Sequence, residues 1–178
     1  MKKVFIAICA LATLTFASCE KQPVGGTATE KTAGQWAVQC IAVDEAGEVV
    51  LEDEDLFGIG TFMLLTYNSA ENIADSMWIS DINDAMGYIW DYHGFLVKTG
   101  CNQANSTFSV TNGLDIIDGD TVNITNGKVL YGAAKTPSGM PADSIVFDVL
   151  FSGDPYAGAY YDRLRITGYR YTGLVNDD

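Results

Sequence analysis

The chain has 178 residues with 23 Asp and Glu against 10 Lys and Arg, so its formal net charge is −13 at pH 7. An acidic chain repels the phosphates of nucleic acids and anionic membrane surfaces, which excludes nucleic acid as a partner. Hydrophobic residues make up 48% of the sequence, which is enough for one domain with a hydrophobic core.

Residues 1–18 have the organisation of a secretory signal peptide. Two lysines precede an apolar run over residues 4–14 that is too short for a transmembrane helix, and small residues follow. Cys19 comes next, which resembles the lipobox of bacterial lipoproteins, where the cysteine is acylated and the chain is cleaved before it. We predict a lipid anchor at Cys19 as the membrane contact, in the cell envelope at the outer membrane, facing either the periplasm or the surface. The alternative is an ordinary secretory signal with an incidental cysteine.

Residues 19–33 predict a flexible tether between this anchor and the folded body. Pro23 and the pair Gly25-Gly26 interrupt a polar stretch that has no apolar period. From residue 34 to residue 178 the pattern changes to that of one folded domain.

Short strands with turn residues between them dominate this domain. β-Branched and aromatic residues, alternation and turn signals predict strands over residues 36–43, 57–67, 87–98, 107–111, 121–125, 128–131, 144–151 and 163–172. The dipeptide Asn126-Gly127 lies between two alternating runs and predicts a tight hairpin, and Asn112-Gly113 predicts a turn. One helical turn is expected over residues 69–76. About eight strands with little helix indicate an all-β, antiparallel barrel or sandwich.

Two motifs at opposite ends of the domain predict that the sheet closes on itself. The first is Gly34-Gln35-Trp36 on the first strand, and the second is residues 168–173 on the last. Side chains alternate along a strand, so Arg170 shares the face of Ile166 and should reach inward. A tryptophan face is a suitable partner for such an arginine, through stacking and cation–π contact. We therefore expect Trp36 and Arg170 to close the barrel.

The Gly-x-Trp and late arginine are similar to the lipocalin and calycin pattern. With the Arg-Tyr-Thr-Gly sequence at residues 170–173, the lipobox and the acidic strand-rich body, the chain resembles the lipid-binding putative hydrolase family of Bacteroides-type lipoproteins over residues 34–174. The resemblance implies a calycin-like barrel with an apolar interior and an envelope location. It supplies no catalytic motif.

The most unusual segment is an aromatic run over residues 88–95. As a strand, it places Tyr88, Trp90 and Tyr92 on one face. These aromatic side chains could form the wall of a site for a lipid or another small apolar ligand, or they could pack against neighbouring strands. We predict that the protein binds a lipid or another small apolar or amphipathic ligand in the mouth of the calycin-like barrel, with these three residues as the ligand wall.

Two other functions stay open on the sequence. An esterase-like hydrolase acting on a lipid ester would need His93, the one histidine of the chain, as its base, with Asp91 on the same strand face as its orienting group. A carbohydrate- or protein-binding module would instead use exposed tyrosines within residues 156–161.

Metal and cofactor sites are not expected. One histidine and the two cysteines that remain beyond the lipobox, Cys40 and Cys101, do not make a zinc site. The acidic segments 81–84 and 115–120 predict turns rather than calcium loops. An oxidising envelope permits a Cys40–Cys101 disulfide, and a buried free thiol at Cys40 is the alternative.

Overall fold

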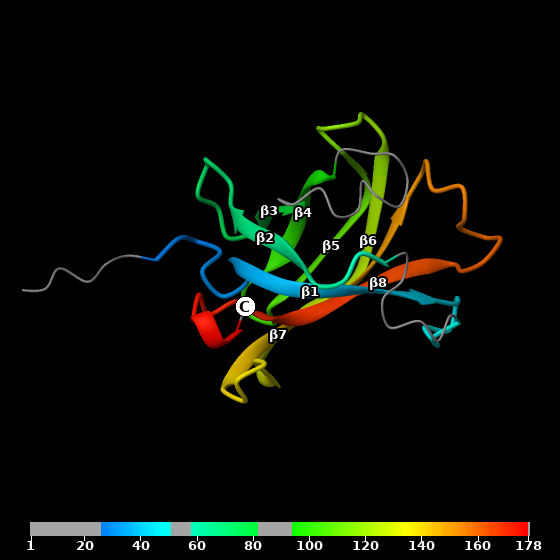
Figure 1. Cartoon of the computed structure of the whole chain (residues 1–178). Helices are drawn as coiled ribbons and strands as arrows, with labels where there is room; N and C mark the ends of the chain where they lie inside the picture. The colour runs from blue at the N-terminus through cyan, green and yellow to red at the C-terminus, as the bar shows by residue number, and fades with distance from the viewer. Residues whose placement is uncertain (1–25, 51–57, 82–93, 178) are drawn as a thin grey trace, which may run out of the picture.

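Eight strands form a closed antiparallel barrel in chain order, and the last strand pairs with the first (Figure 1). The computed structural model describes residues 26–50, 58–81 and 94–177. The strands are β1 (Gly34–Val43), β2 (Phe62–Asn68), β3 (Ser76–Asp81), β4 (Leu96–Asn102), β5 (Thr107–Leu114), β6 (Thr121–Lys135), β7 (Pro141–Phe151) and β8 (Arg163–Arg170). The predicted all-β antiparallel barrel of about eight strands is confirmed.

Helical structure is scarce in the described ranges. It consists of a 3-10 turn, η2 (Val175–Asp177), close to the end of the chain. Within the described ranges, none of the helical structure is long or apolar enough to span a bilayer. The helical turn expected over residues 69–76 is wrong, because these residues form a loop and the first residue of β3.

Alternation of side chains places the core inside the barrel. Along β1, the side chains of Gln35 and Gln39 are exposed. The alternate residues point inward and are buried, namely Trp36, Val38, Cys40 and Ala42. The inward side chains from all eight strands join in one hydrophobic cluster. Phe108 and Phe147 contact edge to face inside this cluster, with ring centroids 5.6 Å apart.

The predicted hairpin at Asn126-Gly127 is wrong, since β6 continues through it for 15 residues. Thr125 pairs with Asp148 and Lys128 with Val146, so β6 advances one residue more than β7 and forms a bulge. Asn126 has a φ of 56°, the left-handed conformation that the same dipeptide would adopt in a hairpin turn. The dipeptide therefore adopts the left-handed conformation that its sequence favours. Because β6 pairs with β5 and β7 on either side of it, this conformation forms a bulge and not a turn.

Gly127 is required at this bulge for steric reasons. A Cβ atom built on Gly127 would overlap the carbonyl oxygen and the ring of Phe108 on β5. The Asn112-Gly113 signal behaves in the same way, because it lies at a register shift within β5 rather than in a turn. The acidic turn at residues 115–120 does form, and Asp115 Oδ1 accepts hydrogen bonds from the amides of Leu96 and Ile117.

The part of the predicted tether that the structure describes packs against the barrel. Thr29 and Thr32 are fully buried. The Thr66 hydroxyl donates to the Thr32 carbonyl at 2.6 Å, and the Tyr131 hydroxyl donates to the Lys31 carbonyl at 2.8 Å. The folded domain therefore begins several residues before the expected boundary at residue 34, because hydrogen bonds to the barrel hold this segment in place.

Candidate functional site

The structure places Trp36 and Arg170 opposite each other on the paired strands β1 and β8. Trp36 is fully buried, and the Arg170 guanidinium carbon lies 4.2 Å from the centre of a Trp36 ring. Arg170 also donates to the Ala33 carbonyl at 2.7 Å and to Asp143 at 3.0 Å. A Cβ on Gly34 would overlap Arg170 Nη1, so any other residue at this position would displace the guanidinium from its place over Trp36. These contacts join β1, β7, β8 and Ala33, the residue that precedes β1.

The predicted ligand wall and catalytic pair lie outside the described residues. Tyr88, Trp90, Tyr92, Asp91 and His93 all fall between β3 and β4 in the chain, within residues 82–93. Their roles in lipid binding and in ester hydrolysis stay predictions. The same holds for Cys19 as the lipid-bearing residue.

Buried hydrophobic side chains line the barrel interior along the described strands. Large buried residues reach both ends of the core, from Trp36 at the start of β1 to Phe95 and Phe151, whose ring centroids lie 5.3 Å apart. Among the residues that the structure describes, a hollow is also found on the outer surface.

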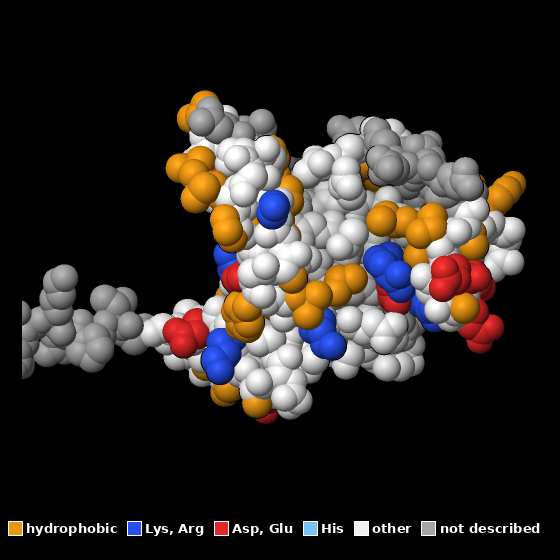
Figure 2. All heavy atoms as spheres, turned by 90° about the horizontal axis from the view of Figure 1, so that it is seen from below, with side chains coloured by type: hydrophobic (Ala, Val, Ile, Leu, Met, Phe, Trp, Pro, Cys, Tyr) orange, Lys and Arg blue, Asp and Glu red, His pale blue; other side chains and the backbone are white. Residues whose placement is uncertain are grey.

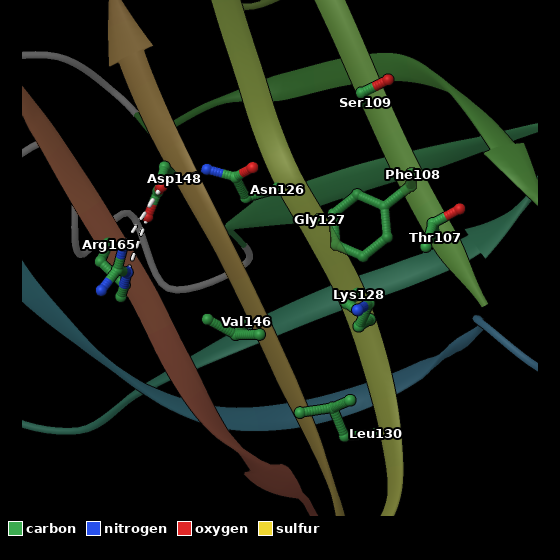
Figure 3. A pocket seen from close by; sticks show the side chains of 10 residues that line it. All are labelled: Thr107, Phe108, Ser109, Asn126, Gly127, Lys128, Leu130, Val146, Asp148 and Arg165. Carbon is green, nitrogen blue, oxygen red and sulfur yellow. Dashed lines mark hydrogen bonds and ion pairs between the residues drawn. The ribbon is translucent and has the colours of Figure 1, made fainter. Parts of the chain in front are cut away.

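A groove of about 630 Å³ crosses the outer face of strands β5 to β8 (Figure 3). This volume is within the range of small-molecule sites, about 300–1,000 Å³. We call it the outer groove, and its lining residues are Thr107, Phe108, Ser109, Asn126, Gly127, Lys128, Leu130, Val146, Asp148 and Arg165. The groove lies over the β6 bulge, where the register of β6 shifts against both neighbouring strands.

The outer groove has an apolar part and a polar part. Figure 3 shows the Phe108 ring beside Gly127, with Val146 and Leu130 farther along the groove and the Asp148–Arg165 pair at the opposite side. The Phe108 ring is 3% exposed and belongs to the core. Leu130 keeps 39% of its surface exposed, so an apolar chain could cover it. Elsewhere, Figure 2 shows one face of the barrel with exposed hydrophobic side chains in separate small groups, not in one broad patch.

The polar part is an ion-pair network around a buried carboxylate. Asp148 keeps 1% of its side chain exposed and accepts hydrogen bonds from Arg165 Nε at 2.8 Å and from Asn126 Nδ2 at 2.8 Å. Arg163 Nε lies 3.9 Å from the same carboxylate. Burial alone would raise the pKa of Asp148, but these hydrogen bonds and positive charges outweigh it and lower the pKa below its usual value. Asp148 is therefore ionised at neutral pH.

A second, smaller hollow of about 290 Å³ adjoins the outer groove. The two share Thr107, Phe108 and Ser109, so together they extend the depression from β4 to β8. Cys101 lines the smaller hollow as a free thiol, and burial raises its pKa above the usual value. Cys40 is also free and is buried in the core, so the buried thiol is observed in place of the disulfide.

The tyrosine loop between β7 and β8 is partly exposed. Tyr160 keeps 66% of its surface exposed and lies 6.0 Å from Tyr156 between ring centroids. Tyr161 turns inward and its hydroxyl donates to Asp154. A carbohydrate or protein partner at this loop stays a prediction.

Sequence analysis missed the outer groove. Arg165 and Asp148 occupy outward positions that alternate with apolar inward residues in their strands, which is a signal of a polar network on the outer face. Their meeting with Asn126 could not be found from sequence, because Asn126 was assigned to a hairpin turn.

The comparisons with known proteins give one family. A family model described as lipid-binding putative hydrolase matches residues 21–175, and the chain belongs to this family. The resemblance that the end motifs indicated is confirmed to that extent. No curated protein matches the sequence. The family and the barrel fold fit a lipid-binding role.

Proposed function

We propose that this member of the lipid-binding putative hydrolase family binds one molecule of a lipid, or a similar small amphipathic ligand, in the outer groove. The observation that carries the proposal is a hollow of about 630 Å³ that combines apolar side chains with charged and amide groups at one side. Ligand sites of this kind use apolar surface for affinity and a few polar groups for orientation.

The apolar contribution comes from two neighbouring strands, because Leu130 on β6 and Val146 on β7 line the groove with surface that is still exposed. Phe108 on β5 also lines the groove, but its ring is 3% exposed and belongs to the core. Covering such side chains with an acyl chain removes apolar surface from water, which gains about 25 cal/mol per Å². The favourable free energy grows with the length of acyl chain that lies in the depression formed by the two adjoining hollows.

Copurified lipid and a matched pair of variants test this function. Native mass spectrometry of the purified protein should show a stoichiometric small molecule, and lipid extraction should identify its class. Leu130→Glu replaces apolar contact surface with a carboxylate that a ligand would have to desolvate, and it also places a negative charge near Lys128, so it should weaken binding by about tenfold or more. Leu114→Glu is the control, because Leu114 is 62% exposed and does not line the groove. Equal binding by both variants and the wild type would place the ligand elsewhere.

We also propose that Cys19 carries a lipid anchor that holds the protein in the cell envelope, at the outer membrane. The support is the lipobox-like sequence alone. Cells grown with labelled palmitate should incorporate label into the wild-type protein but not into Cys19→Ser. Label in both proteins, or in neither, would contradict the anchor.

A further inference from the structure

We infer that the outer groove selects a single-chain ligand with a carboxylate head group, and that Lys128 is the residue that contacts this head group. The inference rests on the proposed function and adds a chemical class of ligand to it. It is carried by the charge balance of the groove and by the position of Lys128 within it.

The charge balance favours an anion. Lys128 and Arg165 bring two positive charges to the lining and Asp148 brings one negative charge. Among the residues that line the groove, one positive charge is therefore uncompensated, in a chain whose formal net charge is −13; Arg163, which lies 3.9 Å from Asp148, does not line the groove. One uncompensated charge matches a monoanion such as a carboxylate better than a doubly charged phosphate monoester.

Arg165 is not the group that supplies this charge to a ligand. Its Nε and Nη2 atoms donate hydrogen bonds to the Asp148 carboxylate at 2.8 Å and 3.3 Å. Its Nη1 atom donates to the Gly47 carbonyl at 3.0 Å. Asp148 is likewise occupied by Arg165 and Asn126. Arg165 and Asp148 therefore compensate each other at one side of the groove, and Arg163 beside them donates to the Asp44 and Glu45 carbonyls.

Lys128 is the cation that remains. In the described part of the chain, its side chain makes no ion pair and no hydrogen bond. It is exposed on β6 and pairs with Thr107 on one side and Val146 on the other. Residues directly opposite on paired strands have Cβ atoms about 4.5–5.5 Å apart, so the Lys128 side chain starts between a hydroxyl residue and an apolar residue.

This arrangement matches the two ends of a fatty acid. The carboxylate can accept from Lys128 Nζ and from the Thr107 hydroxyl, both of which donate hydrogen bonds. The chain can then cover Val146 and Leu130, which lie next to Lys128 on the same outer surface (Figure 3). Because Thr107 also lines the smaller hollow, the head group sits where the two hollows meet.

The test compares two probes that differ in their head group. Isothermal titration calorimetry measures the affinity of dodecanoate, below its critical micelle concentration, and of dodecan-1-ol, below its solubility limit, for the wild type, Lys128→Met and Lys135→Met. Lys135 is the matched control, since it is exposed on the same strand but does not line the groove. Circular dichroism checks that each variant is folded, which we expect because both lysines are exposed.

The wild type and Lys135→Met should bind dodecanoate about tenfold more tightly than dodecan-1-ol, the effect of one charge-assisted hydrogen bond at a partly exposed site. In Lys128→Met this preference should disappear while the affinity for dodecan-1-ol is kept. Equal affinities in the wild type would overturn the head-group inference and leave the proposed function standing. A preference that survives in Lys128→Met would overturn the role of Lys128. If neither probe binds the wild type, the proposed function itself fails.

Discussion

Replacing Trp36 with alanine removes the side chain on which the barrel closure depends. Trp36 is fully buried, its indole nitrogen donates to the Thr66 hydroxyl at 2.9 Å, and the Arg170 guanidinium covers its ring. The variant should still fold into the barrel, because the strand pairs beyond this end keep their register, but its free energy of unfolding should fall sharply.

The size of the loss follows from these contacts. Truncating a fully buried tryptophan costs about 3–5 kcal/mol. Loss of the cation–π contact with Arg170 adds about 0.5–1 kcal/mol. Thr66 adds little, because its hydroxyl keeps its bond to the Thr32 carbonyl. The expected total is about 4–6 kcal/mol, which lowers the thermal midpoint by about 10 °C or more in a domain of this size.

Urea unfolding followed by far-UV circular dichroism measures this loss. Trp36→Phe keeps an aromatic ring under Arg170 and loses mainly the indole hydrogen bond, so it should cost about 1–2 kcal/mol. Trp78→Ala is the control, since Trp78 is only partly buried on the outer face of β3 and should cost less than Trp36→Ala. A loss below about 1 kcal/mol for Trp36→Ala would refute the closure argument, because that size is typical of surface substitutions.

Three further predictions concern the bulge, the C-terminal turn and the cysteines. Gly127→Ala should lower the free energy of unfolding by about 2–3 kcal/mol through overpacking. Gly100→Ala should be nearly neutral in the same urea assay, because its added Cβ would lie 3.5 Å from its nearest neighbour. Equal losses in the two variants would contradict the steric explanation. Hydrogen bonds to Asp177 lower its pKa to about 2, so its contribution to stability is complete above the unfolded-state pKa and is lost as the pH falls from about 4 to 2. Unfolding midpoints of the wild type and Asp177→Asn should therefore converge in this window, and a constant difference down to pH 2 would contradict the assignment. Cys40 and Cys101 are free, so a reductant should not shift the thermal midpoint, and a thiol reagent should reach Cys40 only after unfolding; a reductant-sensitive midpoint would indicate a disulfide.

Strand and barrel assignments could be made from the sequence wherever local patterns decide the structure. Alternation in β1 and β8 gave the inward face, and the Gly-x-Trp motif with Arg170 gave the pairing of the first and last strands. Strand β3 was missed because its inward side chains are few, Met77 and Ile79 among them, and its polar residues match a loop. Pairing with β2 and β4 makes this segment a strand.

Local sequence also determined the conformation at Asn126, but it could not determine the structure around it. A left-handed residue serves equally well in a hairpin turn and in a bulge, and the choice depends on which strands lie on either side. Here β5 and β7 both pair across the dipeptide, so the chain continues. The outer groove was hidden for the same reason, since it lies over this bulge.

The sequence by itself determined that this protein is an acidic β-barrel with a tryptophan and an arginine at its closure, because periodicity and residue type act over a few neighbouring positions. Tertiary structure alone decided where Thr107, Lys128, Val146 and Arg165 meet, since each comes from a different strand. Their meeting depends on the register of three strand pairs, and a shift of one residue in any pair would turn a side chain to the other face. The groove and its uncompensated lysine are therefore properties of the closed barrel.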